Sequence, residues 1–158
     1  MLDTQYGVAT PDQIAGLSGK EILQAIVDGR LPAPPMAETL SFRLVEVGDG
    51  RAHFEGDPGP HLLNPMGGVH GGWALTLIDS ATGCAAQTVL PAGSRYATVE
   101  TKANFSRPIT MDTGRVRAEA WVVASGRQII STEARVTNAE GKVLAHGTST
   151  IIVLNGGS

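Results

Sequence analysis

The chain has 158 residues, a length that suits one domain around one core. Its formal charge is −3, with 12 basic and 15 acidic residues interspersed, and 4% of the chain is aromatic. This composition excludes a nucleic-acid surface made of basic patches and stacking rings. No stretch approaches the roughly 20 apolar residues of a membrane-spanning helix. Residues 1–12 lack the basic start and apolar core of a signal peptide, so we expect a cytoplasmic protein with neither nucleic acid nor membrane as a partner.

Residues 1–36 are predicted to form an N-terminal helical extension. Ser18, with Glu21 three residues later, has the signature of a capping box, and apolar residues follow it at helical spacing. Gly29 is a plausible stop, and a proline-rich stretch follows it. We therefore divide the chain into this extension and a main domain over residues 37–158.

The main domain is expected to start with two strands. From Ala37 the apolar residues recur with a period of two, as Leu40, Phe42 and Leu44 do. The sequence Gly-Asp-Gly at 48–50 marks a turn, because glycine and aspartate favour tight turns. A short second strand is expected near residues 52–55.

One long helix is predicted over residues 71–90. This stretch contains no proline and no period-two alternation, and Pro91 ends it. Its apolar residues recur at helical spacing: Trp73, Leu77, Ala81, Cys84 and Ala85. Asp79 stands inside this pattern, so a helix suited to burial carries an acid in its middle.

Four strand-like segments follow the helix, at 96–105, 115–124, 129–137 and 143–154. The last two are joined by a short hairpin in which Gly141 is expected to take a positive φ. Alternation predicts two shared faces: Ala97, Val99, Ala103 and Phe105 on the first segment, and Val116, Ala118, Ala120, Val122 and Ala124 on the second. The order of elements predicts an α+β domain in which an antiparallel sheet curls around one central helix.

Cysteine and histidine usage argues against a thiol nucleophile and a metal site. Cys84 is the single cysteine and lies in the apolar run, so we interpret it as a small packing residue. Three of the four histidines, His53, His61 and His146, fall on different predicted elements without metal-ligand spacing. No metal is therefore expected.

A glycine-rich motif precedes the helix: residues 64–72 read N-P-M-G-G-V-H-G-G, with an acid nine residues after the histidine. With FSRP at 105–108 and SGR at 125–127, it resembles the hotdog-fold acyl-CoA thioesterases of the phenylacetate-degradation (PaaI-like) type. The resemblance covers roughly residues 37 to 154. It implies a hotdog fold and hydrolysis of an acyl-CoA to free coenzyme A and a carboxylic acid, with no cofactor, since coenzyme A is part of the substrate.

The resemblance implies three catalytic residues. Gly71 corresponds to the glycine whose N–H polarises the thioester carbonyl, Asp79 to the catalytic carboxylate, and Asn64 to a polar side chain that positions the thioester. A helix start presents unpaired N–H groups and a partial positive charge, which suits an oxyanion hole. A carboxylate in an apolar helix is either paired or functional. Asp79 can attack the thioester or activate water, and the sequence leaves both routes open.

Substrate binding is expected to draw on the same motifs. Arg107 and Arg127 are candidates for meeting the phosphates of coenzyme A. We interpret His70 as an anchor of the loop rather than a proton-transfer group. The remaining substrate-binding candidates are Gly72, Ser106, Ser125 and Gly126.

The residue that holds the attacking water is open. Related enzymes place a hydroxyl one turn after the acid, where this chain has Gly83. Ser80 and Thr82 are the hydroxyl side chains near Asp79 on the predicted helix. Neither stands at the expected position, so the sequence assigns water positioning to neither residue.

The spacing of Gly71 and Asp79 predicts a shared site. They are eight residues apart, or about 12 Å along a helix, whereas the reacting atoms must approach to about 3 to 3.5 Å. The acid must therefore come from another subunit, and two-fold symmetry gives two composite sites per homodimer. The resemblance implies that such dimers pair further into a homotetramer.

Two alternative functions remain open at this stage. A hotdog dehydratase or hydratase shares the fold but acts on enoyl or hydroxyacyl thioesters through a histidine and a differently placed acid. A non-catalytic acyl-CoA binding module is the second alternative. The acyl group is also open, since small residues in the helix and sheet can frame an aromatic or a medium aliphatic chain.

Overall fold

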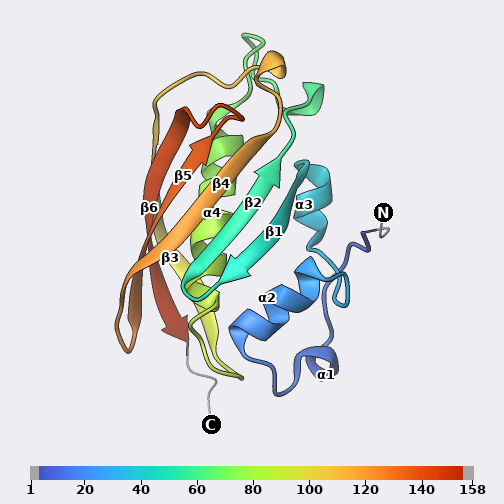
Figure 1. The fold of residues 1–158 in the computed structure, drawn as a ribbon, viewed down its shortest axis with the longest axis vertical. Helices are drawn as coiled ribbons and strands as arrows, with labels where there is room; N and C mark the ends of the chain where they lie inside the picture. The colour runs from blue at the N-terminus through green and yellow to red at the C-terminus, as the bar shows by residue number, and fades with distance from the viewer. Residues whose placement is uncertain (1–3, 155–158) are drawn as a thin grey trace.

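The computed structural model describes residues 4–154, so residues 1–3 of the predicted extension and 155–158 of the predicted main domain lie outside it. Three short helices come first and lie beside the sheet (Figure 1): α1 (Pro11–Ile14), α2 (Gly19–Val27) and α3 (Pro35–Thr39). The predicted capping box is confirmed, because Ser18 Oγ accepts the Glu21 N–H and Glu21 Oε2 accepts the Ser18 N–H. α2 ends at Val27, two residues before Gly29.

The expectation of strand structure from Ala37 is wrong. Pro35 occupies the first turn of α3, where its fixed φ favours a helix, and the helix continues to Thr39. Ser41 then turns the chain with a φ of 53°, and strand β1 (Phe42–Gly48) begins only after it. The division of the chain at residue 37, inside α3, stays a prediction.

The antiparallel sheet has six strands in the order β1-β2-β4-β5-β6-β3. The other strands are β2 (Arg51–Gly56), β3 (Arg95–Phe105), β4 (Val116–Ser125), β5 (Ile129–Thr137) and β6 (Val143–Leu154). The turn at 48–50, the second strand and the last two strands are confirmed, and Gly141 has the expected positive φ of 76°. Two short 3-10 helices, η1 (Pro60–Leu62) and η2 (Met111–Thr113), lie in the connections.

The long helix α4 (Gly71–Gln87) packs against one face of this sheet and contacts all six strands (Figure 1). It ends at Gln87, three residues before the predicted end, with Thr88 as its C-cap. The sheet opposes it with small buried side chains, which let helix and sheet approach closely: Ala52, Ala118, Ala120, Ala134 and Ala145. This arrangement confirms the predicted α+β hotdog architecture. Within residues 4–154, no helix is both long and apolar enough to span a membrane.

The predicted faces need correction where the strands carry bulges. The β3–β6 register shifts between Thr98 and Glu100, and a bulge reverses which side chains face the helix. Ala97 and Val99 are therefore exposed and Tyr96 is half-buried. After the bulge Ala103 is half-buried as predicted, but Phe105 at the end of the strand is exposed. In β4, Val116, Ala118 and Ala120 are buried as predicted, but Ala124 is exposed beyond a bulge after Val122.

Candidate active site

The start of α4 is held by His70. Its Nδ1 accepts the Gly72 N–H at 2.9 Å, and its own backbone N–H donates to the carbonyl of Leu62 at 2.8 Å. The accepting Nδ1 leaves the proton of the neutral ring on Nε2. These bonds support the interpretation of His70 as the anchor of the loop and as the N-cap of the helix.

Gly71, the first residue of α4, keeps its N–H free. Within residues 4–154 this N–H donates no hydrogen bond. A side chain here would meet the ring of Phe105, because an added Cβ would lie 3.2 Å from Phe105 Cζ. The free donor at the positive end of a 17-residue helix can stabilise negative charge on a carbonyl oxygen.

Asn64 organises the loop before the helix. Its Oδ1 accepts the N–H groups of Met66 at 2.9 Å and Gly68 at 3.2 Å. Only the amide oxygen can accept these bonds, so they determine which way the amide points. Its Nδ2 has no acceptor among the described residues and is a second free donor near the helix start.

Asp79 lies on the half-buried face of α4, in a shallow hollow lined also by Met36, Thr76 and Val99. The Thr101 hydroxyl donates to its Oδ1 at 3.0 Å, and no acceptor or donor in the described part of the chain contacts Oδ2. No basic side chain in residues 4–154 forms an ion pair with it. One carboxylate oxygen is thus held in place while the other is free to take a proton or to attack.

Hydroxyl groups behind Asp79 support this arrangement. Thr101 also bonds Ser149 at 2.9 Å, and Ser149 bonds Thr82 at 2.8 Å. Because Thr82 is fully buried and also bonds the carbonyl of Ile78, it belongs to this internal chain and does not hold a water for attack. Sequence reasoning missed Thr101 and Ser149 as site residues. Alternation places Thr101 on the same face as Ala103, but its contact with Asp79 depends on how β3 packs against α4.

The Tyr96 hydroxyl lies beside Gly83, one helical turn after Asp79. Tyr96 Oη lies 3.1 Å from where a Cβ on Gly83 would stand. Burial is the main cause that raises the pKa of Tyr96 above its usual range, and negative charge at Cys84 and Asp79 adds to it. The phenol therefore stays protonated at neutral pH and can donate a hydrogen bond. Sequence reasoning missed Tyr96 as well, because it comes from a strand and not from the helix that carries the acid.

The two candidate phosphate-binding arginines lie at opposite ends of the chain's fold. The segment of Ser106 and Arg107 lies near the helix start, where the Val69 N–H donates to Ile109 O at 3.0 Å. Arg107 Nη1 donates to Val143 O at 2.7 Å. Arg127 lies in the turn after β4, toward the other end of the sheet (Figure 1). One chain thus brings Asn64, His70, Gly71, Gly72, Ser106 and Arg107 together, and leaves Asp79, Ser125, Gly126 and Arg127 apart from them.

Cys84 and the histidines show no competing chemistry. Burial, with a contribution from the charge of Asp79, raises the pKa of the Cys84 thiol to about 12, so it is protonated and unreactive at neutral pH. Among the described residues, no cluster of histidine, cysteine or acidic side chains is placed to hold a metal ion.

Comparison with known proteins gives a consistent result. The sequence model of the thioesterase superfamily matches residues 66–145. Among similar solved structures, a conserved protein from Pseudomonas aeruginosa is 30% identical over 77% of this chain and 95% of its own, with a TM-score of 0.72. A thioesterase family protein from Silicibacter pomeroyi is 28% identical over 85% of this chain and 99% of its own, with a TM-score of 0.75. A mutant of the phenylacetic acid degradation protein PaaI from Thermus thermophilus is 28% identical over 75% of this chain and 97% of its own, with a TM-score of 0.67. No curated protein sequence matches the chain.

Proposed function

We propose that this chain, a thioester hydrolase that belongs to the thioesterase superfamily, acts on acyl-CoA and releases free coenzyme A and a carboxylic acid. Its resemblance to PaaI-like proteins is confirmed by the family match and the similar structures. The observation that carries the proposal is Asp79, with one oxygen held by Thr101 and the other free on the open face of α4.

The proposed chemistry uses Asp79 and a free backbone donor. In the general-base route, Asp79 takes a proton from water, the water oxygen attacks the thioester carbon, and the Gly71 N–H stabilises the oxyanion. The C–S bond then breaks, and the thiolate of coenzyme A takes the proton from Asp79. In the nucleophilic route, Asp79 attacks the thioester carbon, the C–S bond breaks with release of the coenzyme A thiolate, and a mixed anhydride forms. Water then hydrolyses the anhydride to the carboxylic acid and free Asp79, and a proton from this water passes to the thiolate. Label in the Asp79 carboxylate after a single turnover in ¹⁸O-labelled water would establish the nucleophilic route, because only attack of water on the aspartyl carbon of the anhydride puts it there.

The proposed site is shared between two subunits. Gly71 and Asp79 are separated by about 12 Å along α4, and β3 is an 11-residue edge strand with exposed Val99 and Phe105. A long, partly apolar edge strand favours pairing with another chain. Antiparallel pairing in a homodimer would bring Asp79 of the partner subunit to Gly71 and Asn64, and further pairing would give the homotetramer.

The same pairing accounts for the placement of the arginines. Arg107 lies by the start of its own α4 and Arg127 by the far end of the sheet. When two helices run antiparallel, the far end of one chain lies beside the start of the other. The phosphates of one coenzyme A can therefore meet Arg107 of one subunit and Arg127 of the partner subunit, with Ser106, Ser125 and Gly126 lining the path.

A thiol-release assay across short, long and aromatic acyl-CoAs tests the function. The wild type is expected to release coenzyme A, and Asp79→Asn is expected to lower kcat by roughly 10²- to 10⁴-fold with a modest change in KM. More than a third of wild-type kcat in Asp79→Asn would refute the role of the acid. Turnover of enoyl or hydroxyacyl thioesters without thiol release would instead indicate a dehydratase or hydratase, and tight binding without turnover a binding module.

A further inference from the structure

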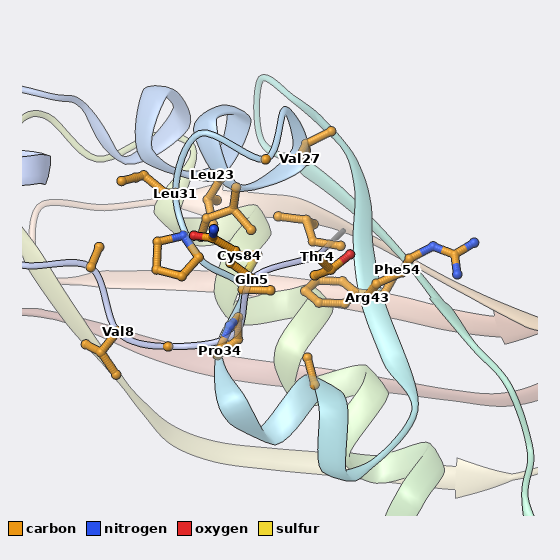
Figure 2. A pocket seen from close by; sticks show the side chains of 18 of the residues that line it. Thr4, Gln5, Val8, Leu23, Val27, Leu31, Pro34, Arg43, Phe54 and Cys84 are labelled. Atoms are coloured by element: carbon orange, nitrogen blue, oxygen red, sulfur yellow. The ribbon is translucent and has the colours of Figure 1, made fainter. Parts of the chain in front are cut away.

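A cavity of about 460 Å³ lies between the N-terminal extension, the first two strands and the C-terminal half of α4 (Figure 2). In Figure 2, Leu23, Val27 and Leu31 of the extension lie in the upper part of the view and Val8 and Pro34 in the lower part, with Phe54 and Cys84 between them. Its lining is mostly apolar and includes Leu23, Val27, Leu31, Leu44, Phe54 and Cys84. The catalytic proposal above makes no use of this space.

The extension is built into the wall of this cavity and packs tightly on α4. A Cβ on Gly19 would stand 1.9 Å from the carbonyl oxygen of Gln87, and the Gly19 N–H donates to Leu90 O at 3.0 Å. The segment before α1 is fastened in the same way, since the Gly7 N–H donates to Ala33 O at 2.9 Å. The wall is therefore a defined part of the fold.

The cavity begins one helical turn beyond Asp79. Tyr96 lines it, and the Tyr96 hydroxyl packs beside Gly83, which is four residues after the acid on the same helix face. α3 separates the two spaces: Met36 lines the hollow that contains Asp79, and its neighbour Ala37 lines the cavity. The cavity is the nearest apolar space along α4 from Asp79, and an acyl chain whose thioester lies at Asp79 has to pass between α3 and Tyr96 to enter it.

The charge of the lining restricts what can enter. Arg43 is the one charged side chain among the described lining residues, and it pairs with Glu55 with its side chain 46% exposed. No free cation in residues 4–154 is therefore available inside to meet a carboxylate. Burying an unpaired carboxylate is strongly unfavourable, so an acyl group with a charged end is excluded.

We infer that this cavity holds the acyl group, that the N-terminal extension sets its length, and that the substrates are acyl-CoAs with uncharged, apolar acyl groups well beyond two carbons. This inference rests on the proposed function. The volume is roughly three times the about 150 Å³ that accommodates a benzene molecule, so an aryl-acyl or a medium-length aliphatic group fits.

Binding of non-hydrolysable S-alkyl-CoA thioethers tests the inference without catalysis. A buried methylene strengthens binding about fourfold, so we expect S-octyl-CoA to bind at least 100-fold more tightly than S-ethyl-CoA by titration calorimetry. In Val27→Trp the indole occupies part of the cavity, and the preference for S-octyl-CoA over S-ethyl-CoA should fall at least tenfold. Ile22→Trp, on the same helix but outside the lining, is the matched control and should keep it. Leu31→Phe offers the same comparison at a second position if Val27→Trp does not fold.

The outcomes separate this inference from the proposed function. Equal binding of the octyl and ethyl thioethers to the wild type, or an unchanged preference in folded Val27→Trp, would overturn the cavity assignment even if the enzyme hydrolyses acyl-CoA. Tight octyl binding that depends on Val27 supports the assignment, and absence of thiol release from octanoyl-CoA would then refute only the proposed hydrolysis. An S-alkyl-CoA of equal length ending in a carboxylate should bind at least 30-fold more weakly, and equal binding would contradict the neutral lining.

Discussion

Mixing two inactive variants should restore activity if each site draws on two subunits. Asp79→Asn removes the acid, and Gly71→Val places a side chain against the Phe105 ring, 3.2 Å from the added Cβ, at the proposed oxyanion donor. Each homodimer then has two damaged sites. A mixed dimer has one doubly damaged site and one intact site, because the intact site takes Gly71 from one chain and Asp79 from the other.

The expected recovery follows from counting. Random pairing of equal amounts gives about half mixed dimers, and each mixed dimer has half its sites intact, so about a quarter of wild-type activity should return. The reason lies in the helix: about 12 Å separates the two residues along α4, and reaction requires an approach of about 3 to 3.5 Å. The variants are unfolded together, refolded and assayed by thiol release.

Each variant refolded alone is the control and should stay inactive, with a wild-type circular dichroism spectrum. Mass spectrometry under native conditions, with one variant carrying an affinity tag, measures the fraction of mixed dimers. An inactive mixture in which mixed dimers form, or a wild type that is active as a monomer, would refute the shared site.

Other predictions test the groups around the acid and the phosphates. Thr101→Val removes the hydrogen bond to Asp79 at nearly constant volume and should lower kcat about tenfold, with KM unchanged within twofold. Thr101→Ser keeps the hydroxyl and should retain activity. An equal loss of kcat in both variants would contradict a positioning role for Thr101. KM for acyl-CoA should rise with salt, and Arg127→Ala should raise KM more than it lowers kcat. Arg30→Ala, at an exposed arginine, is the control. A KM that changes neither with salt nor in Arg127→Ala would contradict the assignment of Arg127 to phosphate binding. Burial raises the pKa of Cys84 from the usual value of about 9 to about 12, so folding favours the neutral thiol. Its contribution to the free energy of unfolding is therefore full below pH 9 and is lost as the pH rises toward 12. In urea titrations, Cys84→Ala should reduce the loss of stability between these pH values, and an unchanged loss would contradict the role of the thiol.

Much of the architecture was predictable from local patterns. The capping box at Ser18, the start of α4 after His70 and the boundaries of the last two strands each depend on neighbouring residues, whose preferences are read directly from the sequence. The motif at 64–72 likewise identified the helix start and the acid, because their spacing along one helix is a property of the chain itself. The free N–H of Gly71 and the capping role of His70 follow from the same local geometry.

What tertiary structure decided is how distant segments meet. The alternation in β3 predicted one unbroken face, but pairing with β6 introduces a bulge before Glu100, and the segment before it is reversed, which brings Tyr96 beside Gly83. Thr101 lies on the predicted face, but its contact with Asp79 depends on how the strand packs against α4. Strand register sets contacts such as that between Thr101 and Ser149, which lie 48 residues apart and carry no local signal. The cavity has the same origin, because its walls come from the extension, two strands and α4, and a space between elements is defined only once those elements have packed.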